Sequence, residues 1–217
     1  MKSTWIRLLC ILSGVQFVCA CSTAPQLAQP GQLSVPRVAP VSPATVNPDQ
    51  KRFLDSQDAS LSRLNVVRTF VVNPKLAEAW QPFAFYVLRS STLPPREREI
   101  LILRIGWLAQ SQYEFTQHVR VGKAAGLKDE EIERIKAGAE APGWSAFDAA
   151  LVRAADQLRA NASIDDAVWE VLKTRYDEKQ LMDVVVTVGQ YNLVSWYLNT
   201  LGTPLEAGVV GYPMQGK

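Results

Sequence analysis

The order of apolar and polar side chains predicts helices throughout the region from Asn73 to Pro204. Residues that favour helix starts and stops divide this region into seven segments, with approximate bounds 73–89, 94–108, 113–125, 129–137, 145–159, 163–175 and 177–202. No stretch of useful length alternates between apolar and polar positions as a half-buried strand does. Val184–Val186 has the β-branched composition of a strand, but the cap before it at Asp177 favours a helix. The pattern therefore predicts an all-α domain, a compact bundle of about six or seven helices.

Local motifs support several of these boundaries. Ser163 with Asp166, and Asp177 with Gln180, resemble capping boxes, in which each side chain binds the other residue's backbone N–H. Single N-caps are expected at Asn73 and Ser145, and glycine stops at Gly126, Gly138 and Gly202. These motifs fix the helix ends more firmly than the periodicity does.

The segment 94–108 is apolar on nearly every face, through Ile100, Leu101, Leu103, Ile105, Trp107 and Leu108. A helix that is hydrophobic all round is buried by its neighbours, so we place this one at the centre of the bundle. The small residues Gly106 and Ala109 allow the next helix to approach closely. Gly189 interrupts the last helix at a cost of about 1 kcal/mol relative to alanine, which predicts a close helix crossing there.

The first twenty residues have the features of an export signal. Lys2 and Arg7 precede a short apolar run that is too short to span a bilayer. The run ends in Val18-Cys19-Ala20-Cys21, which resembles a bacterial lipobox with lipidation at Cys21. No aspartate follows that cysteine, so we expect a lipoprotein on the periplasmic face of the outer membrane, bound to the membrane through its lipid anchor only. Ordinary signal-peptide cleavage near the same place is the alternative.

Residues 21–48 are predicted to be a linker. They contain six prolines among mainly small or uncharged residues, and such a composition buries too little apolar surface to offset chain entropy. The remaining 49–217 is of single-domain size. It contains no cysteine, so its core stands without disulfides even though the protein is exported.

The charge distribution excludes some partners. With 23 Lys and Arg against 21 Asp and Glu, the net charge is +2, and the two signs alternate along the chain. We expect no nucleic-acid binding, because there is no basic stripe and no helix-turn-helix signature. A single histidine cannot form a His-rich metal site, and we predict no metal. A Glu/His site with ligands from several helices is the alternative.

That single histidine, His118, is the main candidate for chemistry. Glu114 lies four residues before it on the same helical face, and Glu99 lies nineteen residues before it on the preceding helix. An imidazole between two carboxylates in a partly apolar pocket can transfer protons near neutral pH, with one carboxylate orienting the ring. Ser111 shares the helical stripe of Glu114 and His118. The structural alternative is a solvated surface pair with Glu99 as an exposed first-turn acid.

Other polar residues are weaker candidates. Tyr191, Asn192 and Asn199 on the last helix lie where they could line a pocket, although buried amides usually bind backbone or neighbouring helices. The tryptophans Trp107, Trp144, Trp169 and Trp196 are expected in the core or at subunit contacts.

The segment from Leu93 to Gly126, followed by LKDEEIERI and later by NTLGTPLE, resembles the carboxymuconolactone decarboxylase family, which includes the alkylhydroperoxidase D-like proteins. The resemblance covers roughly residues 70–206. The peroxidase branch carries CxxCxxxH with a glutamate nineteen residues before the histidine. Here Glu99 and His118 stand at those positions, and Ser111 and Glu114 replace the two cysteines. The decarboxylase branch has a glutamate four residues before its histidine, as Glu114 is here.

This resemblance implies an alkylhydroperoxidase D-like fold and a lyase or isomerase without thiol peroxidase activity, because a peroxidase of this kind needs a thiolate. The implied catalytic residues are His118, Glu114 and Glu99, with Ser111 binding substrate and no cofactor. The substrate is a small molecule such as a lactone or β-keto acid, and the assembly is a homotrimer or homohexamer. The alternative is a non-catalytic exported envelope protein that keeps the fold as a small-molecule-binding or assembly module.

Overall fold

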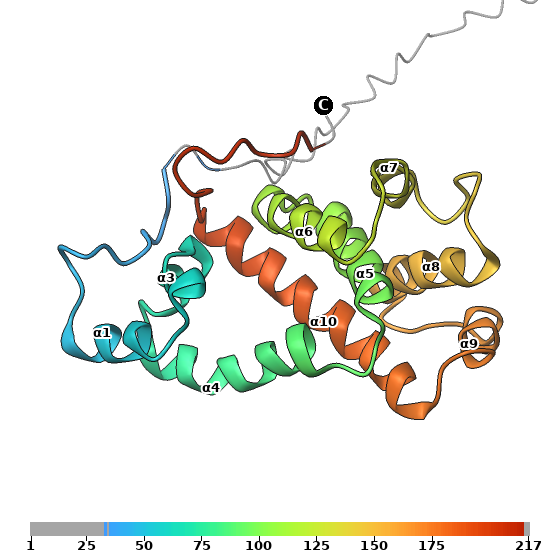
Figure 1. The fold of residues 1–217 in the computed structure, drawn as a ribbon, viewed down its shortest axis with the longest axis horizontal. Coiled ribbons are helices and arrows are strands. Elements are labelled where there is room, and N and C mark those ends of the chain that lie inside the picture. The colour runs from blue at the N-terminus through green and yellow to red at the C-terminus, as the bar shows by residue number, and fades with distance from the viewer. Residues whose placement is uncertain (1–32, 34, 215–217) are drawn as a thin grey trace, which may run out of the picture.

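The computed structural model describes residue 33 and residues 35–214, and Figure 1 shows its fold. This part of the chain forms ten α-helices and one π-helical turn, without strands. The elements are α1 (Pro48–Asp55), α2 (Ala59–Ser62), α3 (Asn65–Phe70), α4 (Pro74–Phe85), η1 (Tyr86–Ser90), α5 (Pro95–Leu108), α6 (Gln112–Ala124), α7 (Asp129–Ala137), α8 (Ala146–Asn161), α9 (Asp166–Lys173) and α10 (Glu178–Leu201). The all-α class is confirmed, and the seven predicted helices correspond to α4–α10.

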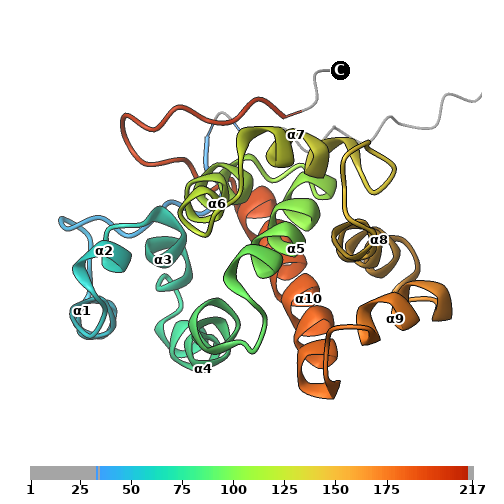
Figure 2. The same cartoon turned by 45° about the vertical axis from the view of Figure 1, so that its right-hand side comes forward.

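Three helices divide the molecule into two sides. In Figures 1 and 2, α5, α6 and α10 lie in the middle, α1–α4 lie on one side and α7–α9 on the other. Helix α5 packs against α6, α8 and α10, and its residues from Glu97 to Trp107 are all buried. The central position predicted for the 94–108 segment is therefore confirmed.

The N-terminal side has a smaller core of its own. Phe70 stacks between Trp80 and Tyr197, with ring centroids 4.0 Å and 3.9 Å away. These contacts join α3 to α4 and to the C-terminal half of α10. They hold the first helices at a fixed place beside the central ones, and this placement forms one wall of the cavity described below.

Two local predictions are wrong. The N-cap of α9 is Asp165, whose side chain accepts from the backbone N–H of Val168, and Ser163 takes no part in the cap. Gly189 does not mark a close crossing within the chain, because a Cβ placed there meets nothing within 4 Å. The capping box of Asp177 and Gln180 and the glycine stop at Gly202 are both confirmed.

The end of the predicted linker is packed on the domain. The backbone N–H of Arg37 donates to Leu201 O at 2.8 Å, and that of Val41 donates to Arg68 O at 3.0 Å. The side chain of Val41 is buried. The packed domain therefore begins about ten residues before the predicted boundary at 48/49, because apolar Val41 finds a partner surface that composition alone does not show.

The predicted signal segment 1–20, Cys21 and the first part of the linker lie outside the described residues. Their export and lipidation remain predictions. Within the described part of the chain, no helix combines the length and apolar character needed to cross a membrane.

Candidate functional site

Close packing of α5 against α6 brings the predicted site residues together. A Cβ on Gly122 would lie 3.3 Å from Leu103 Cδ1 and 3.6 Å from Glu99 Cβ. A Cβ on Gly106 would lie 3.6 Å from Glu114 Cγ. Because 3.6 Å is an ordinary van der Waals distance, glycine is needed for the close contact at 122 and not at 106. The contact predicted at Gly106 is therefore less close than the one at Gly122, which stands four residues after His118.

His118 lies between two carboxylates. Its Nδ1 is 2.7 Å from Glu99 Oε2, and its Nε2 is 3.1 Å from Glu114 Oε1. The exposed fraction is 8% for His118, 0% for Glu99 and 4% for Glu114. The alternative of a solvated surface pair is therefore wrong. The contact with Glu99 has hydrogen-bond geometry. The contact with Glu114 is an ion pair that lacks this alignment, since Glu114 Oε1 has no hydrogen-bond partner in the described structure.

The two carboxylates determine the charge of the ring. Burial by itself lowers the pKa of His118, but the negative charges of Glu99 and Glu114 outweigh burial and raise that pKa to about 10. At neutral pH the ring is therefore an imidazolium, with one N–H directed at Glu99. This differs from the expectation of a ring that titrates near neutrality.

Two further side chains surround the ring. Tyr191 on α10 packs edge-on against His118, with centroids 4.8 Å apart, and burial raises the pKa of its phenol well above the usual range. Arg98 Nε lies 3.5 Å from the other oxygen of Glu99. Glu99 therefore lies between the side chains of His118 and Arg98.

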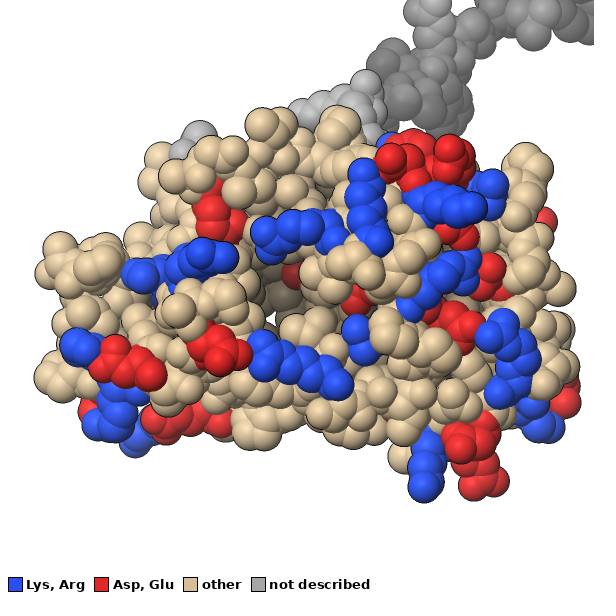
Figure 3. All heavy atoms as spheres, in the orientation of Figure 1, with Lys and Arg blue, Asp and Glu red and all other residues tan. Residues whose placement is uncertain are grey.

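A cavity of about 660 Å³ opens beside the histidine. Figure 3 shows a hollow near the middle of this face, with basic side chains around its edge and acidic atoms visible inside. The lining is mainly apolar and includes six aromatic residues: Phe53, Phe70, Trp80, Phe85, Tyr113 and Tyr191. His118 and Glu114 line this cavity, whereas Glu99 lies behind them and does not.

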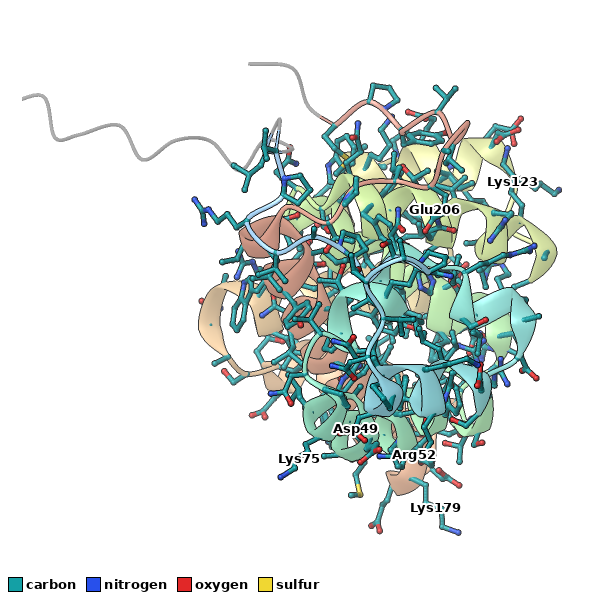
Figure 4. The ribbon with its side chains drawn as sticks, turned by 90° about the vertical axis from the view of Figure 1, so that its left-hand side faces the viewer. Asp49, Arg52, Lys75, Lys123, Lys179 and Glu206 are labelled. Carbon is teal, nitrogen blue, oxygen red and sulfur yellow. The ribbon has the colours of Figure 1, made fainter. Side chains whose placement is uncertain are left out.

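The cavity wall draws on distant parts of the chain. Glu206, after α10, accepts hydrogen bonds from Asn65 N at 2.8 Å, Tyr113 Oη at 2.5 Å and Gln117 Nε2 at 2.5 Å. These bonds join the C-terminal segment to α3 and α6 beside the cavity. Figure 4 shows Glu206 above the N-terminal helices, far from Asp49 and Lys75 at the lower edge.

Sequence comparison finds a family resemblance in one segment of the chain. Residues 74–157 match the profile of the carboxymuconolactone decarboxylase family. Over this segment the chain is similar to that family. The match includes Glu99, Glu114 and His118, whereas α1–α3 and α10 lie outside it. No curated protein is similar enough in sequence to match.

Solved structures with the same fold include two uncharacterized peroxidase-related proteins. One, from Silicibacter sp. TM1040, has a TM-score of 0.64 and 19% identity over 83% of this chain and 94% of that one. The other, an alkylhydroperoxidase AhpD core from Ralstonia eutropha JMP134, has a TM-score of 0.67 and 17% identity over 81% and 94%. A variant of the debrominase Bmp8 in complex with 2,3,4-tribromopyrrole has a TM-score of 0.64 and 13% identity over 78% and 91%. At these identities the similarity establishes the fold alone.

Helices outside the carboxymuconolactone decarboxylase segment complete the cavity. α1–α3 and the two residues between α2 and α3 contribute lining residues that include Phe53, Leu61, Arg63 and Phe70, and α10 contributes Gln190, Tyr191 and Val194. The matched segment therefore supplies the His/Glu cluster, and about half of the lining residues come from outside it.

Ser111 does not line the cavity. Its side chain is fully buried at the N-terminus of α6, and its Oγ has no hydrogen-bond partner in the described structure. The predicted substrate contact is therefore wrong for a ligand in this cavity. Asn199 Nδ2 donates to Ala109 O at 2.8 Å, as expected for a buried amide, whereas Tyr191 is a cavity residue.

Across residues 33 and 35–214, no three His, Cys, Asp or Glu side chains are arranged to hold a metal ion. Both ring nitrogens of His118 already face carboxylates. The polar groups that line the cavity are carboxylates, amides, hydroxyls, two arginines and the imidazolium of His118.

Proposed function

We propose that the chain is a cofactor-free proton-transfer enzyme of the carboxymuconolactone decarboxylase type, acting on a lactone or a β-keto acid. The observation that carries the proposal is the buried Glu99–His118–Glu114 cluster at the inner wall of a cavity large enough for a small molecule. A proton donor and a proton acceptor stand side by side there, away from bulk water.

The roles of the two carboxylates follow from their positions. Glu99 does not line the cavity and binds Nδ1, so we assign it the role of positioning the ring. Glu114 and His118 line the cavity and are the catalytic residues in this proposal. Because the Nε2 contact with Glu114 is not an aligned hydrogen bond, the Nε2 proton remains available to a substrate atom.

The step for a β-keto acid balances with these groups alone. The bond between the carboxylate carbon and the α-carbon breaks, carbon dioxide leaves, and the electron pair passes into an enolate. The imidazolium of His118 stabilises the enolate oxygen and then gives its Nε2 proton to the α-carbon, after which the ring regains a proton from water. In an isomerisation, Glu114 removes a proton beside the carbonyl and returns it to another carbon.

Thiol peroxidase activity does not fit the proposal. The three cysteines, Cys10, Cys19 and Cys21, all precede the domain, and the peroxidase chemistry needs a thiolate at the site. We also retain the proposal of an exported protein that is anchored through a lipid at Cys21.

A specific observation favours a second candidate, a non-catalytic small-molecule-binding module. Both nitrogens of His118 already face carboxylates, and such a clamped imidazolium also fits a purely structural role. That alternative keeps the cavity and predicts no turnover.

An activity screen with lactones and β-keto acids separates the two. Replacing His118 with Gln should lower kcat/KM by about 10²- to 10⁴-fold, the usual loss for a proton-transfer group. Glu99→Gln should move the basic limb of the pH profile to lower pH, because it removes a charge that raises the pKa of His118. Ser111→Ala is the matched control and should leave kcat/KM unchanged.

The outcomes are distinct. Turnover that His118→Gln leaves intact would exclude the proposed mechanism. No turnover of any lactone or β-keto acid by wild type, together with a lower melting temperature in His118→Gln, would support the binding module instead.

A further inference from the structure

The charged side chains that line the cavity form two groups. Glu114 and His118 are buried at its inner wall, whereas Arg63 and Arg120 are exposed at its solvent side. One group is therefore held away from water and the other stands at the mouth. The space between them is enclosed mainly by apolar and aromatic side chains.

The two arginines at the mouth differ in their contacts from several other arginines of the described structure. Arg52, Arg89 and Arg153 each form an ion pair with a carboxylate. Within the described part of the chain, neither Arg63 nor Arg120 has a carboxylate oxygen within 4.0 Å. Arg120 Nη2 donates to Gln117 Oε1 at 3.3 Å, an uncharged partner.

Glu206, the other carboxylate that lines the cavity, already accepts hydrogen bonds from the protein. Glu206 accepts from three donors, two of them at 2.5 Å, so it is fixed in the cavity wall. With His118 protonated, the ionised groups that line the cavity are three cations (Arg63, Arg120 and His118) and two anions (Glu114 and Glu206). The excess is positive, and the two exposed cations are both at the mouth.

We infer that this cavity binds a carboxylate with an extended apolar body, its anionic head at Arg63 and Arg120 and its body directed inward to His118. The direction follows from charge, because the two exposed cations are at the mouth, whereas at the inner wall the positive charge of His118 is offset by Glu114. The length of the body follows from size. A cavity of about 660 Å³ is in the range that holds drug-sized ligands and is much larger than a short keto acid needs.

This inference deepens the proposed function by naming the substrate class, and it rests on that function only for the reacting end at His118. The carboxylate at the mouth is separate from the reacting group, so a β-keto acid of this class carries a second carboxylate, the one that leaves beside His118. The binding part is tested without turnover. Isothermal titration calorimetry on the full-length protein would compare decanoate, decanol and decyltrimethylammonium, which share a chain and differ in the head group. Acetoacetate, a carboxylate without the apolar body, and 2-naphthoate, an aromatic body, complete the set.

Decanoate should bind more tightly than decanol, and decyltrimethylammonium should bind most weakly. Arg63→Gln and Arg120→Gln should each weaken decanoate about two- to fivefold, the range for exposed ion pairs, and leave decanol unchanged. Lys75→Gln is the matched control, because Lys75 carries the same charge on α4, does not line the cavity and lies at the lower edge in Figure 4. The comparison of decanoate with 2-naphthoate tells an acyl body from an aromatic one.

Equal affinities for decanoate and decanol would overturn the inference, as would equal weakening by Lys75→Gln. If acetoacetate binds as tightly as decanoate and 2-naphthoate, the ligand needs no apolar body, and that part of the inference is wrong. His118→Gln should retain decanoate binding. Charge-selective binding without turnover would therefore contradict the proposed function alone, and turnover without charge selectivity would contradict this inference alone.

Discussion

At the scale of single residues, the protein places a positive charge where burial alone would remove it. Desolvation disfavours the imidazolium of His118, but two carboxylates at 2.7 Å and 3.1 Å reverse the balance. The ring is therefore charged because of its neighbours, and each neighbour depends on it in turn. Removing one member leaves a buried charge without its partner.

This charge makes stability depend on pH. The pKa of His118 is raised from 6.5 to about 10 on folding, so its contribution to the free energy of unfolding is full below about pH 6.5. That contribution is lost as the pH rises through about 10. We expect urea midpoints of the wild type to fall between pH 6.5 and 10, and to fall less in His118→Gln. Equal slopes for the two proteins would contradict the raised pKa.

Sequence reasoning reached the site residues but not their orientation. The spacing of Glu99, Glu114 and His118, together with the family resemblance, was sufficient to group them. Which carboxylate faces a ligand depends on where α3, α4 and α10 leave space, and those contacts join residues far apart in the chain. The spacing of residues along a helix indicates which side chains are buried, but it does not indicate where the packed helices leave a cavity.

At the scale of elements, helix starts differ in how they are stabilised. Ser145 Oγ accepts from Asp148 N at 3.0 Å and caps α8, whereas Ser111 at the start of α6 makes no such bond. We expect Ser145→Ala to lower the free energy of unfolding by about 1 kcal/mol, the usual loss for a cap. Ser111→Ala should change it much less, since no hydrogen bond is lost. Chemical denaturation of both variants checks the difference, and equal losses would contradict it.

The elements that sequence analysis missed are the short ones. α2 and α3 have four and six residues and no side-chain cap, so their stability comes from tertiary packing. α1 has a full capping box of Asn47 and Gln50, a signal that was present in the sequence. Asp165 displaced Ser163 as the cap of α9 because it also exchanges hydrogen bonds with Gln157 on α8, a contact that local spacing does not contain.

At the scale of the whole molecule, α10 presents an apolar stripe to solvent. Met182, Val185, Leu193 and Trp196 are exposed and lie on one helical face, and exposed Gly189 falls on the same face. Contiguous apolar surface of this kind marks interaction sites. We propose that copies of this chain associate through the stripe, in the homotrimer or homohexamer that the family resemblance implies.

Substitution of Trp196 tests this assembly. Trp196→Asp should reduce the mass measured by light scattering to that of a monomer, because a charge replaces the largest exposed ring of the stripe. Val210→Asp is the control, since Val210 is 90% exposed and lies outside α10. A wild type that is monomeric at every concentration would contradict the proposal.

The three hydrogen bonds to Glu206 also have a consequence for the order of folding. They join this carboxylate to residues 141, 93 and 89 positions earlier, so they form only after long loops have closed. Glu99 and His118, by contrast, are only 19 positions apart. We therefore expect the wall beside Glu206 to form after α5 and α6 have paired, and a chain that ends before residue 206 would lack all three bonds.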